Sequence, residues 1–152
     1  MSGTGDAGVK PKSAGAANAP TPAKKHEGAP VILLADDDPD IRTMLVRALG
    51  DHYTVYEARD GEEARRLLGA IPKPDAIVLD VMMPRLDGIE LAKIIRKEPA
   101  LQSVPILFLT AKGTPQDILA GINAGARHYV TKPFSVGEVV AKITAMTRPK
   151  KA

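Results

Sequence analysis

The most constraining feature of the sequence is a regular alternation of short apolar runs with longer amphipathic segments. Strand-like runs separated by helix-like segments are typical of βαβ units, which build a parallel sheet. The sequence therefore predicts an α/β fold, a single doubly wound domain with five strands and five helices. The expected strands are Val31 to Ala35, Tyr53 to Ala58, Ala76 to Val81, Ile106 to Thr110 and His128 to Thr131.

Central strands of such a sheet are covered by helices on both faces, and their sequences are then apolar on both sides. The first, third and fourth runs have this character, so we expect them in the middle of the sheet. Helix boundaries are indicated by capping residues, first-turn acids, glycine and proline. The expected helices are Pro39 to Gly50, a segment after Asp60, Leu86 to Lys97, Pro115 to Ala124, and a segment from Ser135 to about Thr147.

Composition divides the chain into a folded domain, expected at residues 30–147, and two tails. Residues 1–28 contain mainly Gly, Ala, Ser, Pro, Thr and Lys, so we expect this segment to be disordered. Residues 148–152 form a short basic tail. The net charge is +3, but its basic excess lies in these tails and no aromatic residue is interleaved with their lysines. We interpret the tails as solvated ends and expect no direct DNA binding.

The sequence also excludes several classes of protein. It contains no cysteine, which rules out disulfides, a thiolate zinc site and a cysteine nucleophile. Its apolar runs are far shorter than the roughly 20 residues that a membrane helix needs, and the N-terminus lacks the apolar core of a signal peptide. We therefore predict a cytoplasmic protein that is not inserted in a membrane.

Polar residues follow four of the predicted strands at their carboxyl ends, where open α/β sheets bind their ligands. Asp36 and Asp37 follow the first strand, Asp80 interrupts the apolar end of the third, Thr110 ends the fourth and Lys132 ends the fifth. Each of these residues has an ordinary alternative role. An aspartate can cap a turn, a threonine favours strands, and a lysine before proline is usually a surface residue.

The position of Asp80 favours a chemical role over a capping role. A carboxylate within an apolar strand needs a partner, and neighbouring carboxylates repel one another unless a cation joins them. If the first and third strands are adjacent, Asp36 and Asp37 lie near Asp80. An all-oxygen site without His or Cys suits Mg²⁺ best. For Asp38, by contrast, helix capping is the better interpretation.

From Val31 to about Met146, the chain resembles the CheY-like receiver domain of two-component response regulators. Four segments carry the resemblance, and they occur in the family's order. They are Ile32-Leu33-Leu34-Ala35-Asp36-Asp37-Asp38-Pro39, Leu79-Asp80-Val81-Met82-Met83-Pro84 with Asp87-Gly88, Leu109-Thr110-Ala111, and Tyr129-Val130-Thr131-Lys132-Pro133-Phe134.

The resemblance implies a sheet of order 2-1-3-4-5 and a phosphorylation-dependent signalling switch. Asp80 would accept a phosphoryl group from the phosphohistidine of a histidine kinase or phosphotransfer protein. Mg²⁺ would be held by Asp37, Asp80 and the backbone carbonyl of Met82, with Asp36 acting through water. It further implies that Thr110 and Lys132 bind the phosphoryl group, Tyr129 moves with the switch, and the bond before Pro133 is cis.

The expected protein is not an enzyme in the usual sense, although it promotes its own phosphorylation and dephosphorylation. Its downstream partner would bind the face formed by the fourth helix, fifth strand and fifth helix. Arg127 and His128 replace acids common in the family, which disfavours the dimer contacts of some DNA-binding members. The short C-terminal tail suggests a stand-alone receiver without an output domain.

Three alternatives remain at this point. The first is a receiver-like interaction module that is not regulated by phosphorylation. The second, a small nucleotide- or flavin-binding protein, lacks the expected glycine-rich turn after the first strand. The third, a phosphatase of the haloacid dehalogenase type, would need an acid at the position of Met82.

Overall fold

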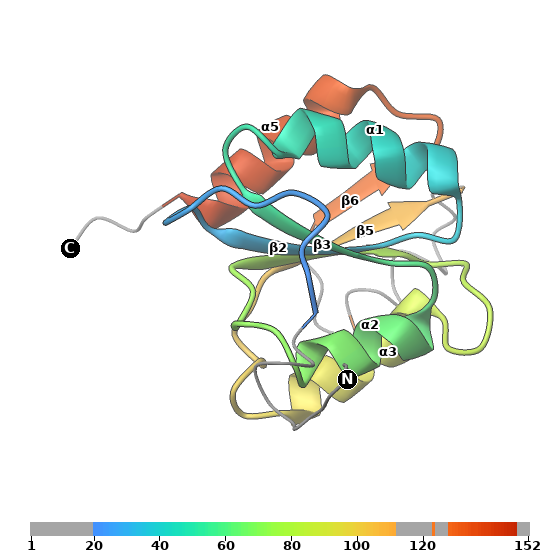
Figure 1. Cartoon of the computed structure of the whole chain (residues 1–152). Helices are drawn as coiled ribbons and strands as arrows, with labels where there is room; N and C mark the ends of the chain where they lie inside the picture. The colour runs from blue at the N-terminus through green and yellow to red at the C-terminus, as the bar shows by residue number, and fades with distance from the viewer. Residues whose placement is uncertain (1–19, 112–122, 124–127, 149–152) are drawn as a thin grey trace, which may run out of the picture.

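The computed structural model describes residues 20–111, 123 and 128–148. It forms one five-stranded parallel sheet with helices on both faces (Figure 1). The strands are β2 (Val31–Ala35), β3 (Thr54–Ala58), β4 (Ala76–Asp80), β5 (Ile106–Thr110) and β6 (His128–Thr131). The described helices are α1 (Pro39–Leu49), α2 (Gly61–Leu68), α3 (Gly88–Lys97) and α5 (Val136–Thr147).

The sheet has the order β3-β2-β4-β5-β6, and every pairing is parallel. In chain order this is 2-1-3-4-5, so the predicted fold class and topology are confirmed. β2, β4 and β5 lie inside the sheet, as their apolar sequences predicted. The predicted fourth helix, Pro115 to Ala124, lies outside the described residues except for Asn123.

The sheet separates two clusters of buried side chains. One cluster packs under α1 and α5 and contains Leu45, Leu49, Val139 and Ile143. The other packs under α2 and α3 on the opposite face, and Phe108 is its largest fully buried side chain (Figure 1). Residues that alternate along each strand supply the two clusters in turn, because successive strand side chains point to opposite faces.

Several element boundaries differ from the sequence-based prediction: Gly50 and Ser135 cap α1 and α5 from just outside these helices, and three other elements start or end at different residues. β3 begins at Thr54 because Tyr53 still belongs to the turn after α1, where its amide donates to the carbonyl of Leu49 at 3.0 Å. β4 ends at Asp80, one residue earlier than predicted. α3 begins at Gly88 rather than Leu86, because the Asp87 carboxylate accepts a hydrogen bond from the amide of Glu90 and caps the helix.

Residues 20–28 of the predicted tail belong to the described part of the chain and include a segment that pairs with the sheet, whereas residues 1–19 lie outside it. Lys24 forms an antiparallel bridge with Val55 in the edge strand β3. An edge strand presents unpaired backbone groups along its outer side, and the segment before β2 pairs with some of them. The composition of this segment gave no sign of that pairing, because backbone groups alone make it.

None of the helices among the described residues has the length and apolar character needed to cross a bilayer.

Candidate functional site

The polar residues predicted at the strand ends meet at one rim of the sheet. Parallel pairing aligns the carboxyl ends of β2, β4 and β5, and β6 lies beside β5 with Thr110 opposite Thr131. Asp36 follows β2 directly, Asp80 ends β4, and Lys132 follows β6. The parallel topology therefore converts residues far apart in the sequence into neighbours.

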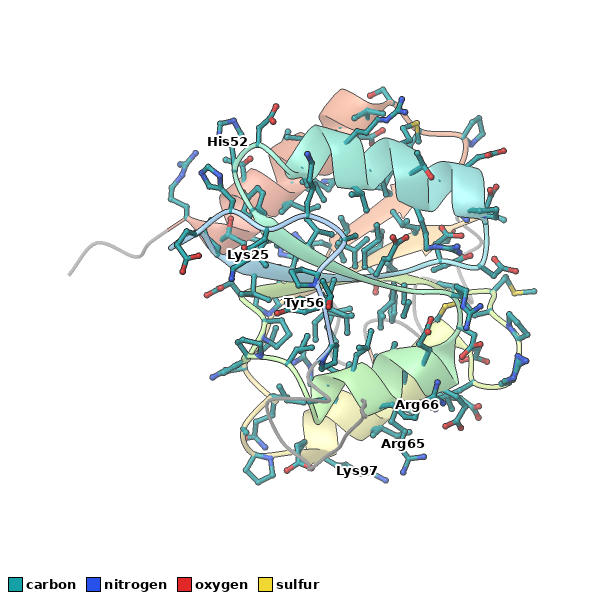
Figure 2. All side chains as sticks on the ribbon, viewed as in Figure 1. Lys25, His52, Tyr56, Arg65, Arg66 and Lys97 are labelled. Carbon is teal, nitrogen blue, oxygen red and sulfur yellow. The ribbon has the colours of Figure 1, made fainter. Side chains whose placement is uncertain are left out.

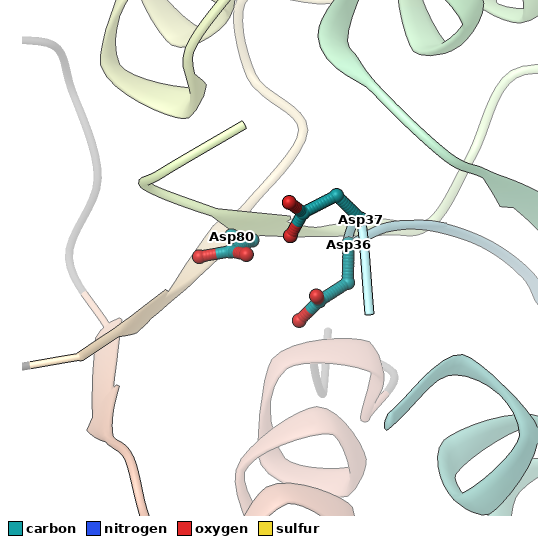
Figure 3. A group of neighbouring side chains, drawn as sticks. All are labelled: Asp36, Asp37 and Asp80. Atoms are coloured by element: carbon teal, nitrogen blue, oxygen red, sulfur yellow. The ribbon is translucent and has the colours of Figure 1, made fainter. Parts of the chain in front are cut away.

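Three carboxylates form the centre of this rim (Figure 3). One oxygen from each of Asp36, Asp37 and Asp80 lies within 4.8 Å of the others. Asp36 is fully buried and Asp80 is 3% exposed, whereas Asp37 faces solvent. Two buried acids and one exposed acid make a site that is closed by the protein on one side and open to water on the other.

Lys132 lies between the two buried carboxylates. Its ammonium nitrogen is 3.1 Å from Asp36 Oδ2 and 3.2 Å from Asp80 Oδ2. Asp36 Oδ2 nevertheless receives no hydrogen bond, so its contact with Lys132 is an ion pair only. One lysine therefore faces three carboxylates, which leaves the cluster with excess negative charge.

The charge balance is reflected in the ionisation of these groups. Burial raises the pKa of Asp80 to about 7, and the negative charge of Asp36 adds to this effect, while Lys132 opposes it. Burial alone would lower the pKa of Lys132, but Asp36 and Asp80 outweigh burial and raise it. Lys132 is therefore a fixed positive charge at neutral pH.

The residues at this rim suit a hard divalent cation. The donors are carboxylate oxygens, one of them buried without a hydrogen bond, and their charge exceeds that of the single lysine. Asp80 Oδ1 already accepts a hydrogen bond from the amide of Met82 at 3.1 Å, which folds the chain after β4 back toward the rim. The side chain of Met82 is 69% exposed and points away from the core.

Arg42 was not identified from the sequence, yet it holds the loop that carries the acids. Its Nη1 donates to the carbonyl of Asp36 at 2.7 Å, and its Nε donates to Glu57 at the end of β3 at 3.0 Å. The Arg42 side chain is only 12% exposed. Arginine in the first turn of a helix carries no local signal for such a contact, because both partners come from outside the helix.

The same loop is fixed by two further hydrogen bonds. Asp36 Oδ1 accepts from the amide of Asp38 at 2.9 Å, and the amide of Asp36 donates to Ala58 at 3.2 Å. Asp38 caps α1, as predicted, by accepting from the amide of Asp40 at 2.8 Å. The buried acid is thus held through its side chain and through both of its backbone polar groups.

Thr110 and Tyr129 lie on the side of the rim nearest β6. Thr110 is 3% exposed. The ring of Tyr129 packs at 5.9 Å from that of Phe108, which is two residues before Thr110 in the same strand. Thr110 and Tyr129 therefore share one face of the sheet. Burial raises the pKa of the Tyr129 hydroxyl, and the peptide bond between Lys132 and Pro133 is cis.

The solved structures that match this fold include receiver domains. A putative response regulator from Chloroflexus aurantiacus matches with a TM-score of 0.74 and 37% identity, covering 80% of this chain and 99% of that one. The receiver domain of sensor histidine kinase PA1611 from Pseudomonas aeruginosa matches with a TM-score of 0.71 and 31% identity, covering 80% of this chain and 100% of that one. That structure is described with a magnesium ion coordinated in its active site cleft.

Sequence comparison gives the same result. Response regulator MprA of Mycobacterium ulcerans is 45% identical over 121 residues, which cover 79% of this chain and 51% of that protein. The chain thus spans about half the length of the curated relatives it matches. The family model described as the response regulator receiver domain matches residues 32–144. With the parallel sheet and the acidic rim, this match shows that the chain belongs to the response regulator receiver domain family of two-component systems.

Proposed function

We propose that this chain is a signalling switch that accepts a phosphoryl group on Asp80. The observation that carries the proposal is the placement of the Asp80 carboxylate. It is almost fully buried at the end of a central strand, it faces a second buried acid, and Lys132 lies 3.2 Å from it. Burying an aspartate next to other carboxylates destabilises the fold, so its presence favours a chemical role over a structural one.

In the proposed reaction, the ionised carboxylate oxygen of Asp80 attacks the phosphorus of a phosphohistidine on a partner kinase or phosphotransfer protein. A P–O bond forms, the P–N bond breaks, and the bonding pair leaves with the imidazole nitrogen. The product is an acyl phosphate. Water later attacks its phosphorus, releasing inorganic phosphate and restoring the carboxylate. Because Asp80 must be ionised to attack, Lys132 assists by opposing the effect of burial on its pKa.

Family membership implies Mg²⁺ at the acidic rim, and the donor set fits this ion. Asp37 and Asp80 would bind it directly with the backbone carbonyl of Met82, and Asp36 would act through water. Bound Mg²⁺ would neutralise charge on the equatorial oxygens of the transferring phosphoryl group. Asp36 and Lys132 meanwhile keep the rim in place, since each contacts the other at 3.1 Å.

Once Asp80 is modified, Lys132 and Thr110 bind phosphoryl oxygens and Tyr129 changes position. The support is their placement on one side of β4: Thr110 ends β5, Tyr129 lies in β6 and Lys132 follows β6, with Thr110 and Tyr129 on one face of the sheet. The downstream partner then binds the face that includes β6 and α5. The fourth-helix part of this face lies outside the described residues. The absence of direct contact between this domain and DNA stays a prediction.

The test is phosphorylation with acetyl phosphate and Mg²⁺, followed by intact mass measurement. Wild type is expected to gain one phosphoryl group and Asp80→Asn none. Asp75→Asn is the matched control, because Asp75 accepts from the amide of Val31 at the opposite end of the sheet. Equal gain in the Asp80 variant would defeat the assignment. No gain in wild type would favour an interaction module that is not regulated by phosphorylation.

A further inference from the structure

The outer side of β3 is an unusual sheet edge. Thr54, Val55, Tyr56 and Ala58 are all buried, and only Glu57 is exposed among the five residues of the strand. A buried edge strand rich in β-branched and aromatic residues is a template for pairing with another chain unless something covers it. Glu57, held by Arg42 at 3.0 Å, places charge on the second half of the strand. The first half has no such charge.

The segment before β2 covers that first half. The amide of Ala23 donates to the carbonyl of Val55 at 2.8 Å, and the amide of Val55 donates to the carbonyl of Lys24 at 2.8 Å. The amide of Lys24 also donates to the carbonyl of Val55, at 3.3 Å, so Lys24 and Val55 exchange hydrogen bonds in an antiparallel bridge. In Figure 1 the blue segment before β2 runs beside β3, and Figure 2 shows Lys25 and Tyr56 at this edge. We call residues 23–26 the arm.

Two further contacts hold the arm against the domain. The Thr54 hydroxyl donates to the carbonyl of His26 at 3.0 Å and accepts from its amide at 2.9 Å. The aliphatic part of Lys24 lies so close to Gly50, at the end of α1, that a side chain at Gly50 would overlap it. Three separate features therefore hold the arm: backbone hydrogen bonds to Val55, hydrogen bonds to the Thr54 hydroxyl, and close packing of Lys24 on Gly50.

The path of the chain explains how the arm stays in place. The amide of Ala29 donates to the carbonyl of His26 at 3.0 Å, and Gly28 has a φ of 78°, which only glycine adopts readily. This turn leads the chain around the start of β3 and into β2, which pairs with the other side of the same strand. β3 thus lies between two parts of the chain: β2 pairs with its inner side, and the arm forms an isolated antiparallel bridge on its outer side.

We propose that the arm guards the edge of the sheet and that, when the arm is released, β3 pairs with β3 of a second copy of this chain. The occupant is a second copy because the exposed edge is self-complementary in an antiparallel pairing, where the same backbone groups meet. The arm competes directly with that pairing, since it already occupies the donor and the acceptor of Val55. The contact between the arm and β3 is independent of the proposed phosphorylation, which takes place at the carboxyl ends of the strands.

The first test asks whether the arm is docked, using hydrogen exchange at the Val55 amide in the full chain. Thr54→Val removes both hydroxyl bonds to His26 and keeps the shape of the side chain. Exchange at Val55 is expected to become about tenfold faster, as for loss of about one hydrogen bond. Thr54→Ser keeps the hydroxyl and is the matched control. Equal exchange in wild type and Thr54→Val would show that this clamp does not hold the arm and would overturn the proposal.

The second test asks whether the arm prevents self-association. The double variant Ala23→Pro with Lys24→Pro removes the two arm amides that donate to the carbonyl of Val55 and leaves the sequence of β3 unchanged. The control carries the same two prolines at Ala16 and Ala17. Analytical ultracentrifugation is expected to show concentration-dependent dimers for the arm variant only. A synthetic peptide of residues 20–28 should return it to the monomer, whereas a scrambled peptide should not.

The combined outcomes decide the proposal. Faster exchange at Val55 together with dimers that the peptide reverses supports it. Faster exchange in Thr54→Val, combined with a double-proline variant that stays monomeric at every concentration, shows that an uncovered β3 does not self-associate and overturns the proposal. Dimers that the peptide does not reverse would place the new contact elsewhere and overturn it as well.

Discussion

At the scale of single residues, Asp80 destabilises the fold that positions it. In the unfolded chain its pKa is near the ordinary value of 3.8, whereas burial and the charge of Asp36 raise it to about 7 in the folded protein. Between these two values the folded state binds more protons than the unfolded state. The free energy of unfolding therefore falls as pH rises through this interval. Protonated Asp80 is tolerated below the interval, whereas ionised Asp80 destabilises the folded state above it.

This leads to a prediction for the metal-free protein. Asp80→Asn cannot ionise, so the variant should be more stable than wild type by more than about 1 kcal/mol at about pH 8, with a smaller difference near pH 5. Urea unfolding in the presence of a chelator measures both values. A difference that is the same at both pH values would mean that the ionisation of Asp80 does not control the effect.

Arg42 supports the acidic loop without belonging to the rim. Arg42→Ala should weaken Mg²⁺ binding by about tenfold, because the carbonyl of Asp36 loses its 2.7 Å donor and the loop loses its link to Glu57. Mg²⁺ titration followed by NMR gives the affinity. Arg47, exposed on the same helix, is the control, and Arg47→Ala should bind as wild type does. Similar affinities in both variants would limit Arg42 to a role in stability.

At the scale of elements, two helix N-termini show how differently glycine can be used. A side chain at Gly88 would overlap the carbonyl oxygen of Asp80, so α3 packs directly on the backbone at the end of β4. Gly137, near the start of α5, has no atom within reach of an added methyl group. Glycine is thus a steric requirement in α3 and a source of unfolded-state freedom in α5.

The corresponding prediction compares two alanine variants. Gly88→Ala should destabilise the protein by about 1–3 kcal/mol and slow phosphorylation of Asp80, because either α3 or the strand end must move. Gly137→Ala should stabilise it by about 0.5–1 kcal/mol and leave phosphorylation unchanged. Urea unfolding and the acetyl phosphate assay report both effects. A Gly88→Ala variant with wild-type stability would mean that α3 can shift without cost.

The sequence predicted those features for which the type of each side chain depends on whether its own position is buried or exposed. Alternating apolar runs predicted the strands, and Asp80 within such a run predicted the rim. It did not predict two sets of contacts between residues that are far apart in the sequence. Arg42 contacts a backbone carbonyl and an acid on another strand, and the arm contacts β3 mainly through backbone groups. Leu86, predicted to start α3, is apolar enough to extend the helical pattern, but the Asp87 cap sets the actual start.

At the scale of the whole molecule, the proposed switch must carry information from β4 across β5 to β6. Phosphate can shift a conformational equilibrium only by interacting differently with its two states, and Thr110 and Lys132 are the groups available for that difference. The contact between Tyr129 and Phe108 makes the outer strand sensitive to any movement of Thr110.

We predict that beryllofluoride, a mimic of the phosphoryl group, shifts the amide signals of β6 and α5 in wild type. In Thr110→Ala the changes should be confined to residues that contact Asp80, because the link to β6 is lost. Two-dimensional NMR of both proteins, with and without the mimic, makes the comparison. Wild-type changes restricted to the rim would leave a phosphate-binding domain without a switch.

The position of the end of α5 has a practical consequence. Tyr53, just before β3, bonds through its hydroxyl to Thr147 at 2.9 Å, so the last turn of this helix is fixed at the amino end of the sheet. Figure 1 shows the end of α5 on the side of the sheet away from the tips of the strand arrows. A purification tag, a fluorescent reporter or a surface tether joined beyond Arg148 would therefore start far from Asp80. Immobilised in this orientation, the protein would present its acidic rim freely to a kinase in solution.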